Sequence, residues 1–158
     1  MVVNGKEVGI SDIMRPPVLI LAEATLHEAL ERMVREKRNS LTVVDEEGKL
    51  LGAVNAVDII KEVMPDYLEQ DEIAAGFADE GIFRENALRV KDKPVRDFMA
   101  KEVPRVTSDS SLVKAAVLAA GLGRGRITVV DSEERPVGIL TRTEIKQVIA
   151  GYLGIPSS

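Results

Sequence analysis

The chain has 158 residues, of which 45% are hydrophobic and 30% are charged, a composition typical of a globular protein. Its net charge of −5 and its 3% aromatic content argue against nucleic-acid binding, which relies on basic surfaces and stacking rings. The absence of cysteine excludes disulfides, cysteine–zinc sites and thiol nucleophiles, and the one histidine, His27, is expected to be exposed. We therefore expect no metal site and no catalytic residues.

Neither a targeting segment nor a membrane span is predicted. Residues 1–10 carry no apolar stretch behind a positive start. No apolar run approaches the ~20 residues that a bilayer-spanning helix needs. The sequence thus predicts a cytoplasmic protein without direct membrane insertion.

The first part of the chain predicts a short strand, a helix, two further strands and a second helix. Thr25 and Glu28 have the spacing of a helix-capping box. Apolar residues then recur at helical spacing on one face: Leu26, Ala29, Leu30, Met33 and Val34. Two apolar runs, Leu41–Val44 and Leu50–Val54, flank a turn and predict a hairpin, and the second helix is expected to begin near Asn55.

Residues 62–93 are expected to form an acidic, partly helical connector. Pro65 is expected to end the preceding helix, because proline lacks a backbone N–H. Apolar residues within the connector indicate packed structure rather than a flexible tether: Ile73, Phe77, Ile82 and Phe83.

The same order of elements recurs after the connector, and the sequence repeats with it. Thr42–Asp45 recurs unchanged as Thr128–Asp131. Upstream, Ser11–Met14 matches Arg96–Met99, with one extra residue following the first copy. We therefore predict two copies, residues 1–61 and 94–158, because one unit of about sixty residues would be marginally stable alone.

Two such copies in order resemble a pair of cystathionine-beta-synthase (CBS) domains. The motifs that carry the resemblance are the segments just named and the stretches Gly52–Asp58 and Gly138–Glu144. The resemblance implies an α/β (α+β) fold of tandem CBS repeats, each β-α-β-β-α, packed as a pseudo-two-fold pair (a Bateman module). Such pairs commonly form homodimers. Many bind AMP, ADP, ATP or S-adenosylmethionine and regulate an enzyme, channel or transporter.

The resemblance also implies ligand-binding residues after the last strand of each copy. Asn55 and Thr141 would contact phosphate, and Asp58 and Glu144 would accept hydrogen bonds from ribose hydroxyls. The same residues also suit a purely structural helix cap. Glu144 departs from the usual aspartate, and Asn55 from the usual serine or threonine, which puts the ribose contact of the second site in doubt and weakens the phosphate contact of the first.

Basic residues are candidates for phosphate contacts. Arg126 would reach the phosphate at the Asp58 site, whereas Ser40 at the matching position of the first copy carries no charge. Arg38 and Arg124 are aligned with each other and are candidates for either phosphate. The alternative is that all three arginines are solvated charges.

Two further features have both a functional and a structural interpretation. Val18 and Val103 match the positions where the family's adenine ring packs, but they also suit the core. The glycine-rich stretch 121–126 suggests a phosphate loop, yet it lacks the Lys-Ser/Thr ending and is better explained as a helix C-cap and turn.

From these features we predict a non-enzymatic regulatory module that binds an adenosyl ligand between its repeats and signals to a partner protein. No cofactor is required, and Mg²⁺ is expected only with a nucleotide. The alternative function is a ligand-free interaction adaptor that acts through its dimer surface.

Overall fold

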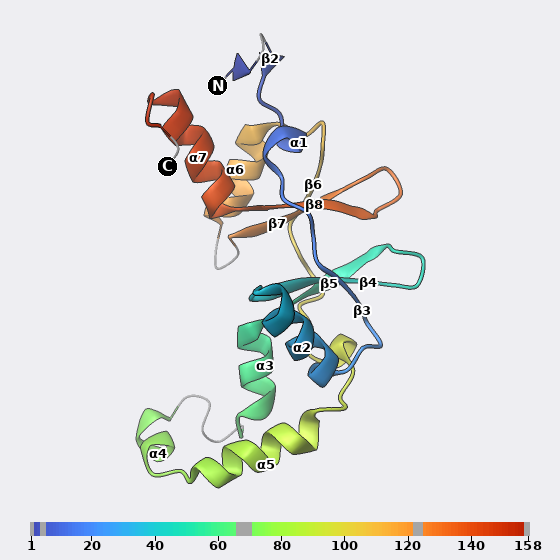
Figure 1. Ribbon diagram of the computed structural model, residues 1–158, viewed down its shortest axis with the longest axis vertical. Coiled ribbons are helices and arrows are strands. Elements are labelled where there is room, and N and C mark those ends of the chain that lie inside the picture. Colours follow the sequence, from blue (N-terminus) through green and yellow to red (C-terminus); the bar gives the residue numbers. More distant parts are fainter. Residues whose placement is uncertain (1, 4–5, 66–70, 122–124, 157–158) are drawn as a thin grey trace. The chain divides into compact units, whose positions relative to one another are not determined.

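A computed structural model describes the chain except residues 1, 4–5, 66–70, 122–124 and 157–158 (Figure 1). The first part of the chain contains β1 (Val2–Val3), β2 (Lys6–Glu7), α1 (Ile10–Ile13), β3 (Leu19–Leu21), α2 (Leu26–Glu36), β4 (Ser40–Val44), β5 (Leu50–Asn55) and α3 (Ala56–Val63). The connector contains α4 (Glu72–Gly76) and α5 (Glu80–Val90). The last part contains the 3₁₀ helix η2 (Val95–Asp97), β6 (Arg105–Thr107), α6 (Leu112–Ala120), β7 (Arg126–Val130), β8 (Pro136–Thr141) and α7 (Arg142–Tyr152).

Each sequence copy contributes one three-stranded sheet with the predicted order of strands and helices. The strand orders are β3-β4-β5 and β6-β7-β8. The first two strands of each sheet run parallel, and their registers are equivalent: Leu19 pairs with Thr42, and Arg105 pairs with Thr128. The mixed α/β fold and the internal repeat are therefore confirmed.

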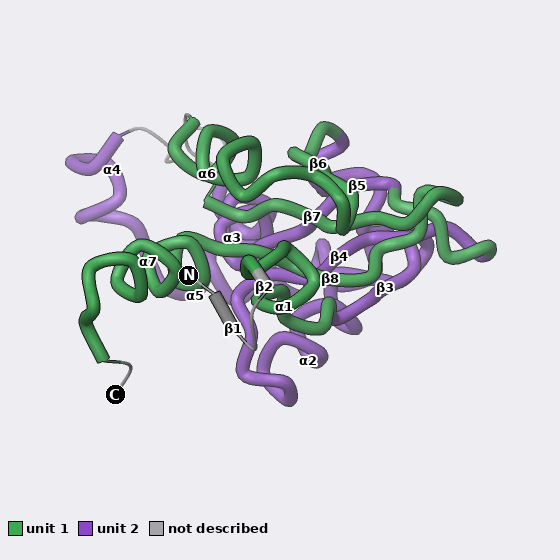
Figure 2. Tube along the Cα trace, turned by 90° about the horizontal axis from the view of Figure 1, so that it is seen from above, with its two compact units in different colours: residues 1–17, 47–50, 102–158 green, residues 18–46, 51–101 purple. Residues whose placement is uncertain are grey.

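The described residues form two compact units (Figure 2). Unit 1 consists of Met1–Pro17, Glu47–Leu50 and Glu102–Ser158, and unit 2 consists of Val18–Glu46 and Leu51–Lys101. The short segment that begins each copy thus packs with the main body of the other copy. The boundaries predicted at 61/62 and 93/94 follow the sequence repeat and stay a prediction.

Equivalent backbone contacts attach each exchanged segment. In unit 1, Arg15 and Ile139 exchange two backbone hydrogen bonds of 2.9 and 2.8 Å. In unit 2, Ala100 and Ala53 exchange two of 3.0 and 2.8 Å. Because Met14 and Met99 are aligned, Arg15 and Ala100 occupy the same place in the two units.

The core of each unit is aliphatic, as the composition requires. Unit 2 is centred on buried residues of α2, β4, β5 and α3: Leu26, Ala29, Met33, Leu41, Val43, Val54 and Ile59. Unit 1 has a matching cluster: Ile10, Val106, Ala115, Ala119, Ile127, Val129 and Leu140. The apolar face predicted for α2 is broader than the core that it covers, because Leu30 and Val34 are 42% and 72% exposed.

The connector is helical in part, as predicted. Helix α3 ends at Val63, directly before Met64 and Pro65. Helix α5 packs on α3, and its residues Val90 and Ala87 belong to the apolar core of unit 2. Within the described residues, no helix combines the length and the apolar character needed to cross a bilayer.

Candidate functional site

The residues predicted to bind ligand in the first copy lie at the start of α3. Asn55 is the N-cap: its side-chain Oδ1 accepts a hydrogen bond from the Asp58 N–H at 3.0 Å. Its own N–H donates to Asp58 Oδ2 at 2.8 Å. This reciprocal capping box confirms the structural interpretation of both residues. Asp58 is half-buried, so it is less enclosed than a core residue.

The equivalent residues of the second copy, Thr141 and Glu144, lie at the start of α7, where the carboxylate has more contacts than that of Asp58. Glu144 is buried, and its Oε2 accepts hydrogen bonds from the Thr141 N–H at 2.7 Å and from the Thr141 hydroxyl. Its Oε1 lies 3.7 Å from Nε of Arg15, and the Glu144 side chain is only 5% exposed. Both carboxylate oxygens are therefore engaged within unit 1.

Arg126 lies beside the same helix start. On the sheet of unit 1 it pairs directly with Thr141, as β7 runs antiparallel to β8. Its side chain is half-buried. The predicted contact of Arg126 with a phosphate at the Asp58 site involves both units and stays a prediction.

Two arginines at this helix start were missed as site residues by sequence reasoning. Arg15 contacts Glu144, although the two residues are 129 positions apart in sequence. Arg142 lies against Gly125, where a β-carbon would meet its side chain. No local pattern signals the Arg15 contact, because it depends on the exchange of the N-terminal segment.

The remaining predicted residues are dispersed. Val18 is half-buried against the core of unit 2, and Val103 is half-buried in unit 1. Arg38 follows α2, where its side chain lines a surface pocket of about 380 Å³ with Asn39 and Ala56. Arg124 lies outside the described residues.

The capping interpretation of the glycine-rich stretch is confirmed where the chain is described: Gly121 is the C-cap of α6, and its N–H donates to the Leu118 carbonyl.

His27 is exposed, as predicted.

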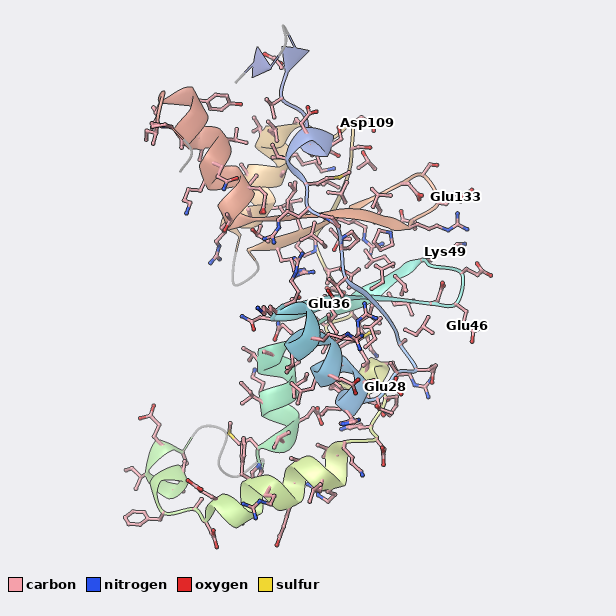
Figure 3. The ribbon with its side chains drawn as sticks, in the orientation of Figure 1. Glu28, Glu36, Glu46, Lys49, Asp109 and Glu133 are labelled. Carbon is pink, nitrogen blue, oxygen red and sulfur yellow. The ribbon has the colours of Figure 1, made fainter. Side chains whose placement is uncertain are left out.

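A further pocket of about 360 Å³ lies in unit 2 between β3 and α2. Glu28 of α2, labelled in Figure 3, is one of its lining residues. The others are Leu19, Ile20, Leu21, Ala24, Glu31, Arg32 and Arg35. Its lining carries two acidic and two basic side chains, so it offers no net charge to select a ligand.

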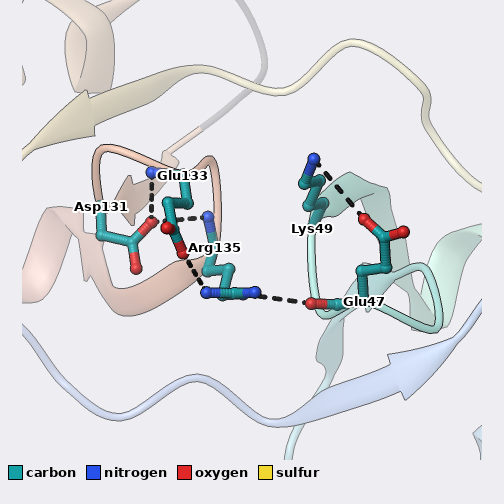
Figure 4. Close-up of polar contacts among 5 residues, drawn as sticks. All are labelled: Glu47, Lys49, Asp131, Glu133 and Arg135. Atoms are coloured by element: carbon teal, nitrogen blue, oxygen red, sulfur yellow. Dashed lines mark hydrogen bonds and ion pairs between the residues drawn. The ribbon is translucent and has the colours of Figure 1, made fainter.

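The hairpin turns of both copies hold acidic residues that form hydrogen bonds and ion pairs there (Figure 4). Backbone N–H groups of Arg135 and Glu133 donate to Asp131 Oδ1 at 3.0 and 2.8 Å. These hydrogen bonds lower the pKa of Asp131. Arg135 pairs with Glu133, and its Nε donates to the Glu47 carbonyl at 3.1 Å. The hydrogen bonds and the ion pair therefore fix the turn geometry.

Comparison with known proteins agrees with this fold. A family model described as the CBS domain matches residues 10–65 and 95–151. An uncharacterised protein of Methanocaldococcus jannaschii, MJ1426, is 27% identical over 161 residues, which cover 93% of this chain and 94% of the relative. The L-aspartate semialdehyde sulfurtransferase of the same organism is 24% identical over 143 residues, but this chain spans only 23% of its length.

Solved structures of CBS-domain pairs have the same fold. CBSX2 of Arabidopsis thaliana in complex with AMP superposes with a TM-score of 0.69 at 23% identity, covering 93% of this chain and 99% of that chain. The CBS domain pair of MJ0100, in complex with 5-methylthioadenosine and S-adenosyl-L-methionine, gives 0.67 at 24% identity, covering 92% and 98%. With a family match at two positions that together cover most of the chain, this protein belongs to the CBS domain family and contains two CBS domains in tandem.

Proposed function

We propose that this chain is a non-catalytic regulatory module that binds an adenosyl ligand between its two CBS domains and signals to a partner protein by a conformational change. The observation that carries the proposal is that Asp58, in the first turn of α3, is only half-buried and has a hydrogen bond to one of its two carboxylate oxygens. The CBS pairs of CBSX2 and MJ0100, which bind AMP and S-adenosylmethionine, support the class of ligand.

The chemistry of this position suits a nucleoside. Within the described part of the chain, the Asn55 N–H donates a hydrogen bond to Oδ2 of the Asp58 carboxylate. This bond orients the side chain, and Oδ1 is available to accept a hydrogen bond from a ribose hydroxyl. The N-terminal amides of α3 favour an anion such as a phosphate nearby.

Signalling requires that the ligand distinguish two arrangements of the protein. A ligand shifts a conformational equilibrium only by the difference between its affinities for the two states. We propose that an adenosyl ligand favours one arrangement of the CBS domains, and that an enzyme or transporter responds to that arrangement.

A thermal-shift panel tests the proposal. AMP, ADP, ATP and S-adenosylmethionine are added to the protein with and without Mg²⁺. A ligand at 100 times its dissociation constant should stabilise the fold by about 2.7 kcal/mol. This corresponds to roughly 5–10 °C for a chain of this size. The matched variant Asp58→Asn, compared with its own ligand-free midpoint, should lose most of that shift.

The alternative is an interaction adaptor that works without a small ligand. The observation that favours it is a set of exposed apolar side chains on the helices of both copies, which include Val34 and Val117 at 72% and 67% exposure. If folded, ligand-free protein shows no shift with any of the compounds, the sensor proposal is wrong and the adaptor is preferred.

A further inference from the structure

We infer that Arg15 and the cap at Thr141 withhold Glu144 from a ligand, so that the chain binds one adenosyl ligand, whose ribose contacts Asp58. This inference rests on the proposed function and adds to it the number of ligands and the acid that recognises them. It follows from a difference between two positions that the sequence repeat makes equivalent.

The two acids differ in their surroundings. The Glu144 side chain is 5% exposed, with the Thr141 N–H and hydroxyl bound to Oε2 and the Arg15 guanidinium 3.7 Å from Oε1. Asp58 is half-buried, and one backbone N–H donates to one of its oxygens. A ribose would have to displace the hydrogen bonds to Oε2 or the ion pair at Oε1, and breaking hydrogen bonds to a buried charge is costly.

The exchanged N-terminal segment explains why only one acid is held. Arg15 and Ala100 make equivalent backbone pairs with Ile139 and Ala53. The residue in this place in unit 1 therefore carries a guanidinium that reaches Glu144, whereas in unit 2 it carries only a methyl group. The methyl group of Ala100 cannot pair with Asp58.

The start of α7, which holds Glu144, also has more positively charged neighbours in the sequence repeat than the start of α3, which holds Asp58. In unit 1, Arg126 pairs across the sheet with Thr141, and Arg142 follows it in sequence. The aligned positions of the first copy are Ser40 and Ala56, which carry no charge. The helix start that holds Glu144 therefore has arginines at two positions where the helix start that holds Asp58 has uncharged residues.

Isothermal titration calorimetry with AMP and with S-adenosylmethionine tests the inference. The wild-type chain should bind one ligand per chain. Asp58→Asn should weaken binding about tenfold or more, as expected for a lost hydrogen bond to a charged group. Glu144→Gln, which removes the charge but keeps the size, should leave the dissociation constant within about threefold, since Glu144 does not contact the ligand in this account.

The outcomes separate the inference from the proposed function. Two ligands per chain, or equal weakening by Asp58→Asn and Glu144→Gln, would overturn the inference while supporting a ligand-binding module. Absence of binding by both compounds contradicts the proposed function. The ion pair is tested independently in ligand-free protein: Arg15→Ala should lower the melting temperature in wild type but not in a Glu144→Gln background. Equal effects in both backgrounds would show that Arg15 does not hold Glu144.

Discussion

The hairpin turns show how a single residue type sets local stability. Gly48, in the turn after β4, has φ +83°, and the aligned residue Glu134, in the turn after β7, has φ +63°. Both positions require left-handed backbone, which a side chain disfavours. Figure 3 labels neighbouring residues of the two turns, Glu46, Lys49 and Glu133. The first copy therefore meets the requirement with glycine, whereas the second accepts some strain.

Gly48→Ala should lower the free energy of unfolding by about 1–2 kcal/mol, because alanine resists the left-handed conformation. Urea denaturation followed by circular dichroism measures the change. Glu134→Gly is the matched control. It removes the strain of a side chain in left-handed backbone but also removes the exposed ion pair with Arg105, so the free energy of unfolding should change less than in Gly48→Ala. An unchanged midpoint for Gly48→Ala would contradict this account of the turn.

Residues whose roles are local could be predicted from the sequence, and residues whose roles depend on the exchange could not. Both capping boxes, Asn55/Asp58 and Thr141/Glu144, follow from a spacing of three residues and are present. The ion pair between Arg15 and Glu144 depends on which copy receives the N-terminal segment. A repeat read from the sequence suggests that each segment packs with its own copy, so the pair was not anticipated.

At the scale of elements, the exchanged segments explain the aligned glycines of β5 and β8. A β-carbon at Gly52 would overlap the backbone carbonyl of Ala100, and one at Gly138 would overlap the side chain of Met14. The sequence shows these glycines as a repeated motif. Their physical reason, the close approach of the segment that begins the other copy, appears only in the structure.

Gly52→Ala should destabilise the protein by about 1–3 kcal/mol, the usual cost of overpacking, because a backbone carbonyl cannot move aside without breaking the Ala53–Ala100 pair. Gly138→Ala should cost less, because the flexible Met14 side chain can rotate. Urea midpoints of the two variants test this order. Gly76→Ala in α4 is the control, as its added methyl group would meet no atom within 4 Å. A larger loss for Gly138→Ala would contradict the argument.

The helices show where pattern and packing diverge. The apolar stripe of α2 predicted a helix correctly, since spacing alone specifies one face. It could not show that Leu26, Ala29 and Met33 face the core while Leu30 and Val34 remain exposed. This division depends on which side chains the rest of unit 2 covers. An apolar stripe broader than the core it covers is itself evidence for a further contact.

For the whole molecule, each copy has four large, exposed apolar residues on its pair of helices, in addition to those on other elements. On α2 and α3 they are Leu30, Val34, Val57 and Ile60, and on α6 and α7 they are Val113, Val117, Ile149 and Tyr152. Exposed apolar patches often mark protein interfaces. A face that the internal repeat presents twice suits a second copy of the chain, because closed dimers use self-complementary surfaces. We therefore propose a homodimer through these helices.

The double variant Val34→Glu/Val117→Glu should halve the mass measured by light scattering after size exclusion, because each charge would be desolvated at the interface without a partner. Circular dichroism should show unchanged secondary structure, since both side chains are exposed. Ile73→Glu is the matched control: Ile73 is 77% exposed on α4, outside the proposed face, and its substitution should leave the mass of the dimer unchanged. A wild-type chain that runs as a monomer at micromolar concentration, or a double variant that keeps the wild-type mass, would contradict dimerisation through these helices.

If dimerisation and ligand binding are coupled, the double variant should also bind an adenosyl ligand with altered affinity, because linkage makes the effect of each event on the other reciprocal.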